Sequence, residues 1–161
     1  MLSGYEKTRD TSHSNVFCSM KLLFITQKID RQDDVLGFVH RWVQKLSERC
    51  SRLTVICLEK GECDLPETVQ VLTLGKESRQ SRLMYLLCFY RYIRRLRCEY
   101  DVVLVHMNPI YVVMGFLFWR LWSKRIFMWY NHEYGNWLAK AAVRYVQTVL
   151  YTSPFSFAAR N

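Results

Sequence analysis

Long apolar runs are missing from this chain of 161 residues. The longest, residues 110–119, has ten residues before Arg120 interrupts it, whereas a membrane-spanning helix needs about 20. Residues 1–19 are polar and lack the apolar centre of a cleavable signal peptide. We therefore expect a cytoplasmic protein without a transmembrane helix.

Paired cysteines and several short catalytic motifs are missing too. The six cysteines, at positions 18, 50, 57, 63, 88 and 98, include no CxxC pair, and several lie in apolar runs. This favours buried, reduced thiols over disulfides or zinc ligands. No Walker loop or GxSxG elbow occurs, and His132 with Glu133 does not form an HExxH motif. The sequence predicts no bound metal ion.

What the chain does have is a largely apolar and basic composition. Half of its residues are hydrophobic and 15% are aromatic, which argues against disorder over most of its length. The length suffices for one domain with its own core. The net charge of +9 favours an anionic partner: nucleic acid, a phosphate-bearing ligand or an anionic membrane face.

Apolar runs typical of buried strands alternate with segments of helical period. Residues 1–19 are rich in Ser, Thr and charge, so we expect a disordered extension there, with Met20 as an alternative start to Met1. The folded domain is residues 20–161. Ser78 or Ser81 is expected to cap the second helix. Strands are expected at 21–26, 53–58, 69–73, 102–106, 126–130 and 148–151, and helices at 36–49, 79–97, 109–122 and 136–146. The pattern predicts an α/β fold, a Rossmann-like parallel sheet with helices on both faces.

Two strings carry a family likeness. DDVLGFVHRW (residues 33–42) and VHMNPIYVV (residues 105–113) follow each other at the spacing found in bacterial family 4 glycosyltransferases of the GT-B type. The likeness extends from Met20 to about Ser156, so the chain resembles the N-terminal, acceptor-side domain of these enzymes. The resemblance implies a retaining transfer of a sugar from a nucleotide-sugar to a lipid-linked or polysaccharide acceptor, with no metal cofactor. The basic composition of the chain would hold such a protein at the inner face of the cytoplasmic membrane.

The sequence departs from this family in two ways. The donor-binding domain, with its paired glutamates, has no counterpart after the final segment YTSPFSFAARN. We therefore expect the isolated chain to be inactive without a donor-binding domain or a separate donor-binding subunit. In addition, NHEYGN surrounds His132 where a Thr-His-Lys-like segment is commoner.

Gly37 and His132 are the first two candidate site residues. Gly37 lies where a helix should begin, and a glycine there lets backbone N–H groups approach the donor phosphate; the alternative is a glycine that only permits the turn. His132 follows a strand at the carboxyl edge and, by the resemblance, contacts the transferring sugar as the catalytic residue; the alternative is a loop histidine bonded to backbone. We expect both to face one open groove.

Three further residues are candidates for binding the acceptor. His106 and Asn108 end the strand at residues 102–106; His106 is equally compatible with a buried, satisfied histidine, and Asn108 with a residue that shapes the turn before Pro109. Asp34 lies in the first loop together with Asp30 and Asp33. Carboxylates in this position could orient an acceptor hydroxyl or act as a base. The simpler explanation is a solvated acidic loop in which Asp34 supports the helix start.

Basic residues interleave with aromatic ones in the second helix. A solvated helix face explains this pattern first, an anionic membrane surface second and nucleic acid last. Trp119 and Trp122 in the next helix suit a membrane interface, although core packing also explains them. A non-catalytic, membrane-surface or partner-binding Rossmann module therefore remains an alternative function. The interleaved residues are Tyr90, Arg91, Tyr92, Arg94, Arg95 and Arg97.

Overall fold

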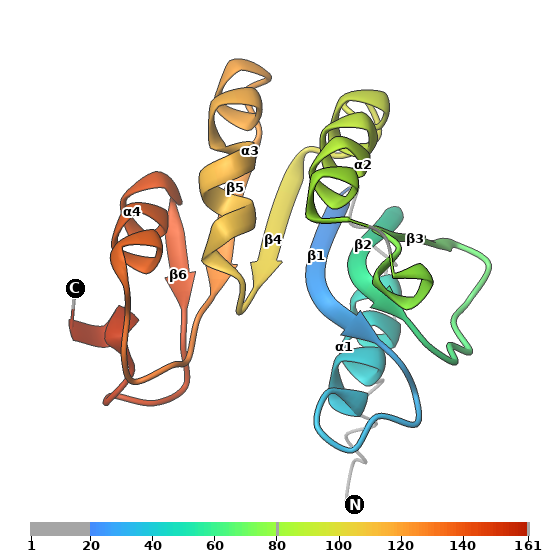
Figure 1. Ribbon diagram of the computed structural model, residues 1–161, viewed down its shortest axis with the longest axis horizontal. Coiled ribbons are helices and arrows are strands. Elements are labelled where there is room, and N and C mark those ends of the chain that lie inside the picture. The colour runs from blue at the N-terminus through green and yellow to red at the C-terminus, as the bar shows by residue number, and fades with distance from the viewer. Residues whose placement is uncertain (1–19, 80, 161) are drawn as a thin grey trace, which may run out of the picture.

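The computed structural model of the chain describes residues 20–79 and 81–160 and centres on one sheet of six strands (Figure 1). The expected extension, residues 1–19, lies outside the described residues. The strands are β1 (Lys21–Ile29), β2 (Arg52–Lys60), β3 (Val69–Thr73), β4 (Val102–His106), β5 (Arg125–Trp129) and β6 (Thr148–Leu150). The helices are α1 (Gly37–Ser47), α2 (Arg82–Arg95), α3 (Pro109–Leu121) and α4 (Trp137–Tyr145), with the short 3-10 helices η1 (Lys76–Ser78) and η2 (Phe157–Arg160).

Every strand pairs in parallel with its neighbours, in the order β3-β2-β1-β4-β5-β6. The chain first moves outward from β1 to β3, returns through α2 to β4, and then continues outward to β6. The strand order therefore reverses between β1 and β4. In open α/β sheets, ligands bind outside the carboxyl ends of the strands at such a switch point.

Helices cover both faces of the sheet, as expected, but unequally. Helix α1 lies on one face, and α2, α3 and α4 lie on the other (Figure 1). This division follows from the right-handed crossover of parallel strands, because connections that move in opposite directions along the sheet put their helices on opposite faces.

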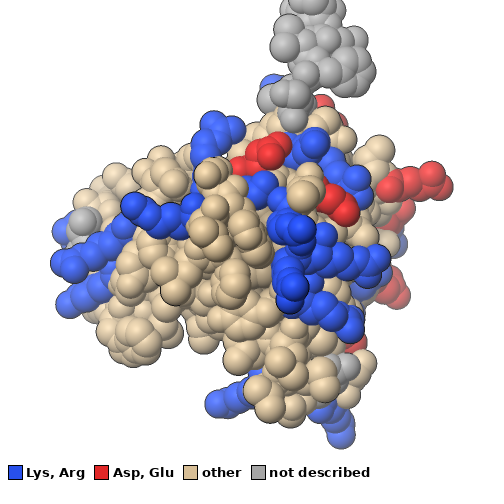
Figure 2. Space-filling view, turned by 90° about the horizontal axis from the view of Figure 1, so that it is seen from above, with Lys and Arg blue, Asp and Glu red and all other residues tan. Residues whose placement is uncertain are grey.

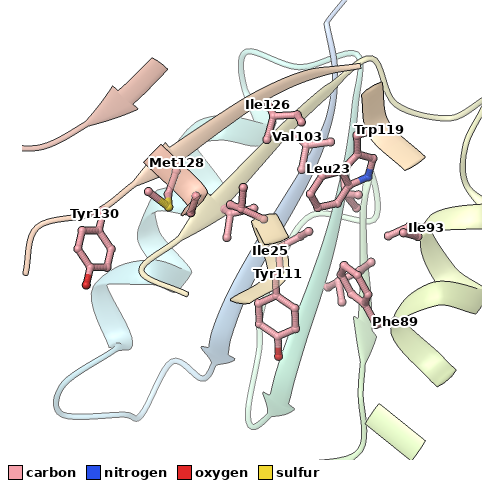
Figure 3. Close-up of a cluster of buried hydrophobic side chains, with 14 of the residues drawn as sticks. Leu23, Ile25, Phe89, Ile93, Val103, Tyr111, Trp119, Ile126, Met128 and Tyr130 are labelled. Carbon is pink, nitrogen blue, oxygen red and sulfur yellow. The ribbon is translucent and has the colours of Figure 1, made fainter. Parts of the chain in front are cut away.

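The strand β1 shows why a central strand of this sheet has a continuous run of apolar residues in its sequence. Leu23, Phe24 and Ile25 are all fully buried, although successive side chains of a strand point to opposite faces. Leu23 and Ile25 pack in the cluster beneath α2, α3 and α4 (Figure 3). Phe24 packs in the cluster beneath α1. Burying each such side chain contributes about 1.5–3 kcal/mol, so both layers stabilise the central strand.

Two local expectations are decided by the structure. The strand β1 continues to Ile29 and does not end at Thr26, because Ile29 is fully buried and pairs with Lys60 of β2. The sequence did not predict this extension because Gln27 and Lys28 are polar. Of the two serines expected to cap α2, Ser81 is the cap: its Oγ accepts a hydrogen bond from the Met84 amide.

The thiols of Cys57, Cys63, Cys88 and Cys98 are free. Burial raises the pKa of the Cys57 thiol to about 12, so this side chain is an uncharged part of the core. In the part of the chain that the structure describes, no helix has the length and apolar character to cross a membrane.

Candidate functional site

The carboxyl ends of all six parallel strands meet at one edge of the sheet, the lower edge in the view of Figure 1. Gly37 follows β1, Asn108 follows β4 and His132 follows β5. These strands are neighbours in the order β1-β4-β5, so the residues sit at or beside the switch point. The three residues therefore lie at the carboxyl edge of the sheet, the position that the sequence analysis expected for them.

The loop between β1 and α1 is held by Asp33. One oxygen of its carboxylate accepts hydrogen bonds from the amides of Val35 (3.0 Å) and Leu36 (2.6 Å), and the other lies 2.7 Å from Lys28 Nζ. The bonds from Lys28 and from these amides lower the pKa of the Asp33 carboxyl to about 2. The expectation that Asp34 supports the helix start is therefore wrong, since Asp33 does so. Asp34 is exposed.

Gly37 is the first residue of α1, and its amide donates to the Asp33 carbonyl over 2.9 Å. A Cβ at this position would meet the Arg31 carbonyl at 3.4 Å, an ordinary contact, so packing within the chain does not require glycine here. The Asp33 carboxylate already occupies the positive end of α1 that would attract a phosphate. Gly37 and Asp34 line a cavity of about 650 Å³.

His132 is not among the residues that line this cavity. Gly37 and His132 therefore lie at the same edge of the sheet but do not line this cavity together. The single groove that the sequence analysis expected around both residues is not formed by this cavity.

His106 is buried at the switch point, with 3% of its surface exposed. Its Nδ1 lies 3.1 Å from the Thr26 hydroxyl of β1, and its ring packs against Phe24, Phe38 and Trp42. Burial lowers the pKa of His106 to about 4, so the imidazole is neutral at neutral pH. Of the two alternatives that the sequence left open, the structure favours the buried histidine, which is bonded to Thr26 through Nδ1.

An aromatic cluster around His106 was missed by the sequence reasoning. Trp42 lies 5.6 Å from His106 and 4.8 Å from Trp129, measured between ring centroids, and Phe38 lies 5.3 Å from Trp42. Phe38, Trp42 and Trp129 are only partly buried. The spacing of Phe38 and Trp42, four residues apart on one helix face, was the available signal. The cluster forms an aromatic wall beside the carboxyl edge.

In the turn after β4, the side-chain amide of Asn108 makes no hydrogen bond with the described residues. Met107 has a left-handed backbone (φ 60°), a conformation that is uncommon outside glycine and often found at functional sites. Its amide donates to the Trp129 carbonyl over 2.8 Å. Asn108 precedes α3, but its side chain makes no capping bond and no hydrogen bond with any described residue. The half-buried Asn108 amide is thus free to meet a ligand.

His132 lies in an exposed loop that the residues after β6 hold in place. The Asn131 side chain accepts hydrogen bonds from the amides of Thr152 and Ser153, both 3.1 Å long, and the Phe157 amide donates to the His132 carbonyl over 2.8 Å. The imidazole ring lies 5.3 Å from that of Tyr130 and makes no hydrogen bond with the described residues. The loop backbone is fixed while the ring stays accessible.

The described residues of these loops do not include a cluster of side chains that could bind a metal ion. Within residues 20–79 and 81–160, no three His, Cys, Asp or Glu side chains form a group that could hold a metal ion. The chemistry available at this edge is hydrogen bonding from Asn108 and His132, with carboxylates on the β1–α1 loop.

Fold and site together define a Rossmann-like α/β half-domain with its polar side chains at a topological switch point. Such a half-domain is found within HepE (Alr3699) of Anabaena, whose crystal structure was determined in complex with UDP. The two share 16% sequence identity with a TM-score of 0.54, over 85% of this chain and 39% of HepE. No protein-family model matches the sequence, and no curated protein does.

The chain thus spans about two fifths of the length of HepE. At this level of identity the likeness establishes the fold.

Proposed function

We propose that the chain is the acceptor-side half of a retaining, family 4, GT-B type glycosyltransferase. The observation that carries the proposal is the gathering of Asn108 and His132 at the switch-point edge of a fold shared with HepE, which was solved with UDP. A fold alone does not give a function; the unused polar groups at this edge are what support sugar transfer.

His132 is the residue we assign to the transferring sugar. Its exposed imidazole is available either to donate a hydrogen bond to a sugar hydroxyl or to stabilise charge on the departing phosphate. Asn108 and the exposed carboxylate of Asp34 are assigned to acceptor hydroxyls. Gly37 is not assigned to the donor phosphate, because the Asp33 carboxylate at the start of α1 would repel it. For His106, which is buried, we propose a positioning role in place of the acceptor contact.

The nucleotide-sugar would be held mainly by a donor-binding half, in the same polypeptide or as a separate subunit. The acceptor-side half supplies only part of the electrostatic cradle for the diphosphate, so it should bind a nucleotide-sugar weakly by itself. No metal ion is needed in this scheme, because donor-side groups would balance the phosphate charge. Assembly of the two halves is therefore a requirement for turnover.

The proposal is tested by mixing this chain with the purified donor-binding half and measuring UDP release from UDP-glucose, UDP-galactose and UDP-N-acetylglucosamine. We expect a complex on size exclusion and turnover that neither half shows alone. His132→Ala should reduce turnover about 10²-fold or more, while the matched variant of its exposed neighbour, Glu133→Gln, should retain it. Absence of both complex and transfer would refute the proposal.

A second candidate, a module that binds an anionic membrane surface, is favoured by the charge on α2 and α3. Residues 78–98 and 102–132 contain nine Lys and Arg but no Asp or Glu. Figure 2 shows that basic side chains dominate the end of the molecule where α2 and α3 terminate. Large apolar side chains are exposed on the same helices: Leu83, Leu87, Leu117 and Leu121. Each basic residue near an anionic bilayer contributes about 1 kcal/mol.

Flotation with vesicles separates this candidate from the first. The chain should float with phosphatidylglycerol-containing vesicles and not with pure phosphatidylcholine vesicles, and Arg94→Glu with Arg95→Glu should abolish flotation. Equal flotation with both kinds of vesicle would rule out an electrostatic membrane site. Flotation without any sugar transfer by the assembled halves would favour the module over the enzyme.

A further inference from the structure

A second cavity opens between α2 and α3, on the face of the sheet opposite α1. Its volume is about 540 Å³, within the range of small-molecule sites. Its walls come from α2 between Arg82 and Tyr90, from the first half of α3 and from Leu58 of β2, so the groove begins at the carboxyl edge of the sheet. We call it the α2–α3 groove. It is lined by Leu58, Arg82, Tyr85, Leu86, Tyr90, Ile110, Tyr111 and Met114.

The lining of the α2–α3 groove is aliphatic and aromatic, with one cation. Arg82 is exposed at the first position of α2 and makes no ion pair with the described residues. An unpaired guanidinium at a helix N-terminus favours a phosphate or carboxylate. Acidic side chains, which would repel such a group, are absent from the lining.

Tyr111 supplies an independent indication of a ligand. Only 7% of the residue is exposed, and its hydroxyl makes no hydrogen bond with the described residues. In Figure 3 this hydroxyl points away from the core cluster, toward the carboxyl ends of the neighbouring strands. Burial raises the pKa of Tyr111 to about 12, so the group is a neutral hydroxyl. The hydroxyl is not among the fully enclosed, unpartnered polar atoms of the described residues, and Tyr111 lines the groove, so a ligand in the groove can reach this group.

We propose that the α2–α3 groove binds one aliphatic chain of a phosphate-bearing lipid, with the phosphate on Arg82 and a polar group of the lipid on the Tyr111 hydroxyl. An aliphatic chain matches the apolar walls, and the phosphate matches the unpaired Arg82. Leu83 and Leu87 continue the apolar surface outside the groove, giving the lipid a path from a bilayer.

The position of the groove relates this lipid to the sugar-transfer site. Asn108 lies two residues before Ile110, which lines the groove, so Asn108 is near the end of the groove at the carboxyl edge of the sheet. If the proposed function holds, on which this step rests, the acceptor is lipid-linked and not a free polysaccharide. The binding of the lipid itself does not depend on the sugar-transfer proposal.

Isothermal titration of the full chain with dodecyl phosphate, below its critical micelle concentration, tests the groove. Dodecanol and inorganic phosphate are the comparison probes and should bind at least tenfold more weakly, because each lacks one of the two recognised parts. Arg82→Gln should weaken dodecyl phosphate binding about tenfold, and Tyr111→Phe about fivefold, from the loss of a charged and a neutral hydrogen bond respectively. Ile110→Trp fills the groove and should weaken binding more than tenfold.

Matched variants keep the test specific to the groove. Leu117→Trp adds the same bulk to an exposed position of α3 outside the groove, and Arg91→Gln removes a charge from α2 outside it; both should bind like the wild type. The inference is overturned if the wild-type chain does not bind dodecyl phosphate, or if each control variant loses as much affinity as its partner. Because no donor half or nucleotide-sugar is present, these outcomes do not bear on sugar transfer.

Discussion

Acidification should destabilise this fold through His106. The side chain is 3% exposed, its folded-state pKa is lowered from 6.5 to about 4, and its contacts are the Thr26 hydroxyl and the rings of Phe24, Phe38 and Trp42, none of which carries a charge. Between these two pKa values the unfolded chain binds one more proton than the folded chain. The stability due to the neutral histidine is therefore complete above about pH 6.5 and is lost as the pH falls toward 4.

The size of the effect follows from the two pKa values. Over the whole interval the loss is about 3 kcal/mol, and between pH 7.5 and pH 5 it is roughly 2 kcal/mol. For a domain of this size that corresponds to a fall in Tm of roughly 4–8 °C. The free energy of unfolding, measured by urea titration at both pH values, gives the quantity directly.

Two histidine variants assign the effect to its source. His106→Gln keeps a polar partner for the Thr26 hydroxyl but does not titrate, so its stability should change by about 2 kcal/mol less than that of the wild type between the two pH values. His40→Gln, at a second histidine that is buried among the described residues, should retain the wild-type decline. A decline that survives in His106→Gln would show that His106 is not the group responsible.

Three further substitutions test the packing and the site. Tyr100→Phe should cost about 2 kcal/mol, because the buried Trp119 indole donates to the Tyr100 hydroxyl over 3.1 Å and would lose its acceptor; an unchanged urea midpoint would contradict that bond. Gly115→Ala should destabilise by about 1–3 kcal/mol despite a better helix propensity, because the added Cβ would lie 2.4 Å from the Trp119 ring; a gain in stability would mean that the ring moves freely. His132→Ala should leave the free energy of unfolding within about 0.5 kcal/mol of the wild-type value while it lowers the turnover of the assembled halves. A loss of stability that accompanies the loss of turnover would point to a structural role.

The order and kind of elements could be predicted from the sequence because the strands β1, β4 and β5 carry uninterrupted apolar runs. Leu23, Phe24 and Ile25 are apolar in succession since both faces of a central parallel strand are covered. The prediction ended β1 too early because a local window does not show that Ile29 pairs with Lys60 across the ladder. Alternation of strands and helices likewise predicted the parallel sheet.

The candidate site was predicted less completely, because its residues are held by partners that lie far away in the sequence. His106 is bonded to Thr26, 80 residues away, and the loop that carries His132 is fixed by Ser153 and Phe157. No local pattern distinguishes a buried histidine from an exposed one when the covering residues come from other segments.

The sequence by itself determined which segments become strands and helices, and hence that the loops around Gly37, Asn108 and His132 share one edge of the sheet. Only the tertiary structure decided which side chains at that edge remain free. Packing between distant segments buries His106 and engages Asp33, because a side chain's exposure depends on every element that packs against it. Among the described residues, Asn108, His132 and the Tyr111 hydroxyl keep unused hydrogen-bonding capacity.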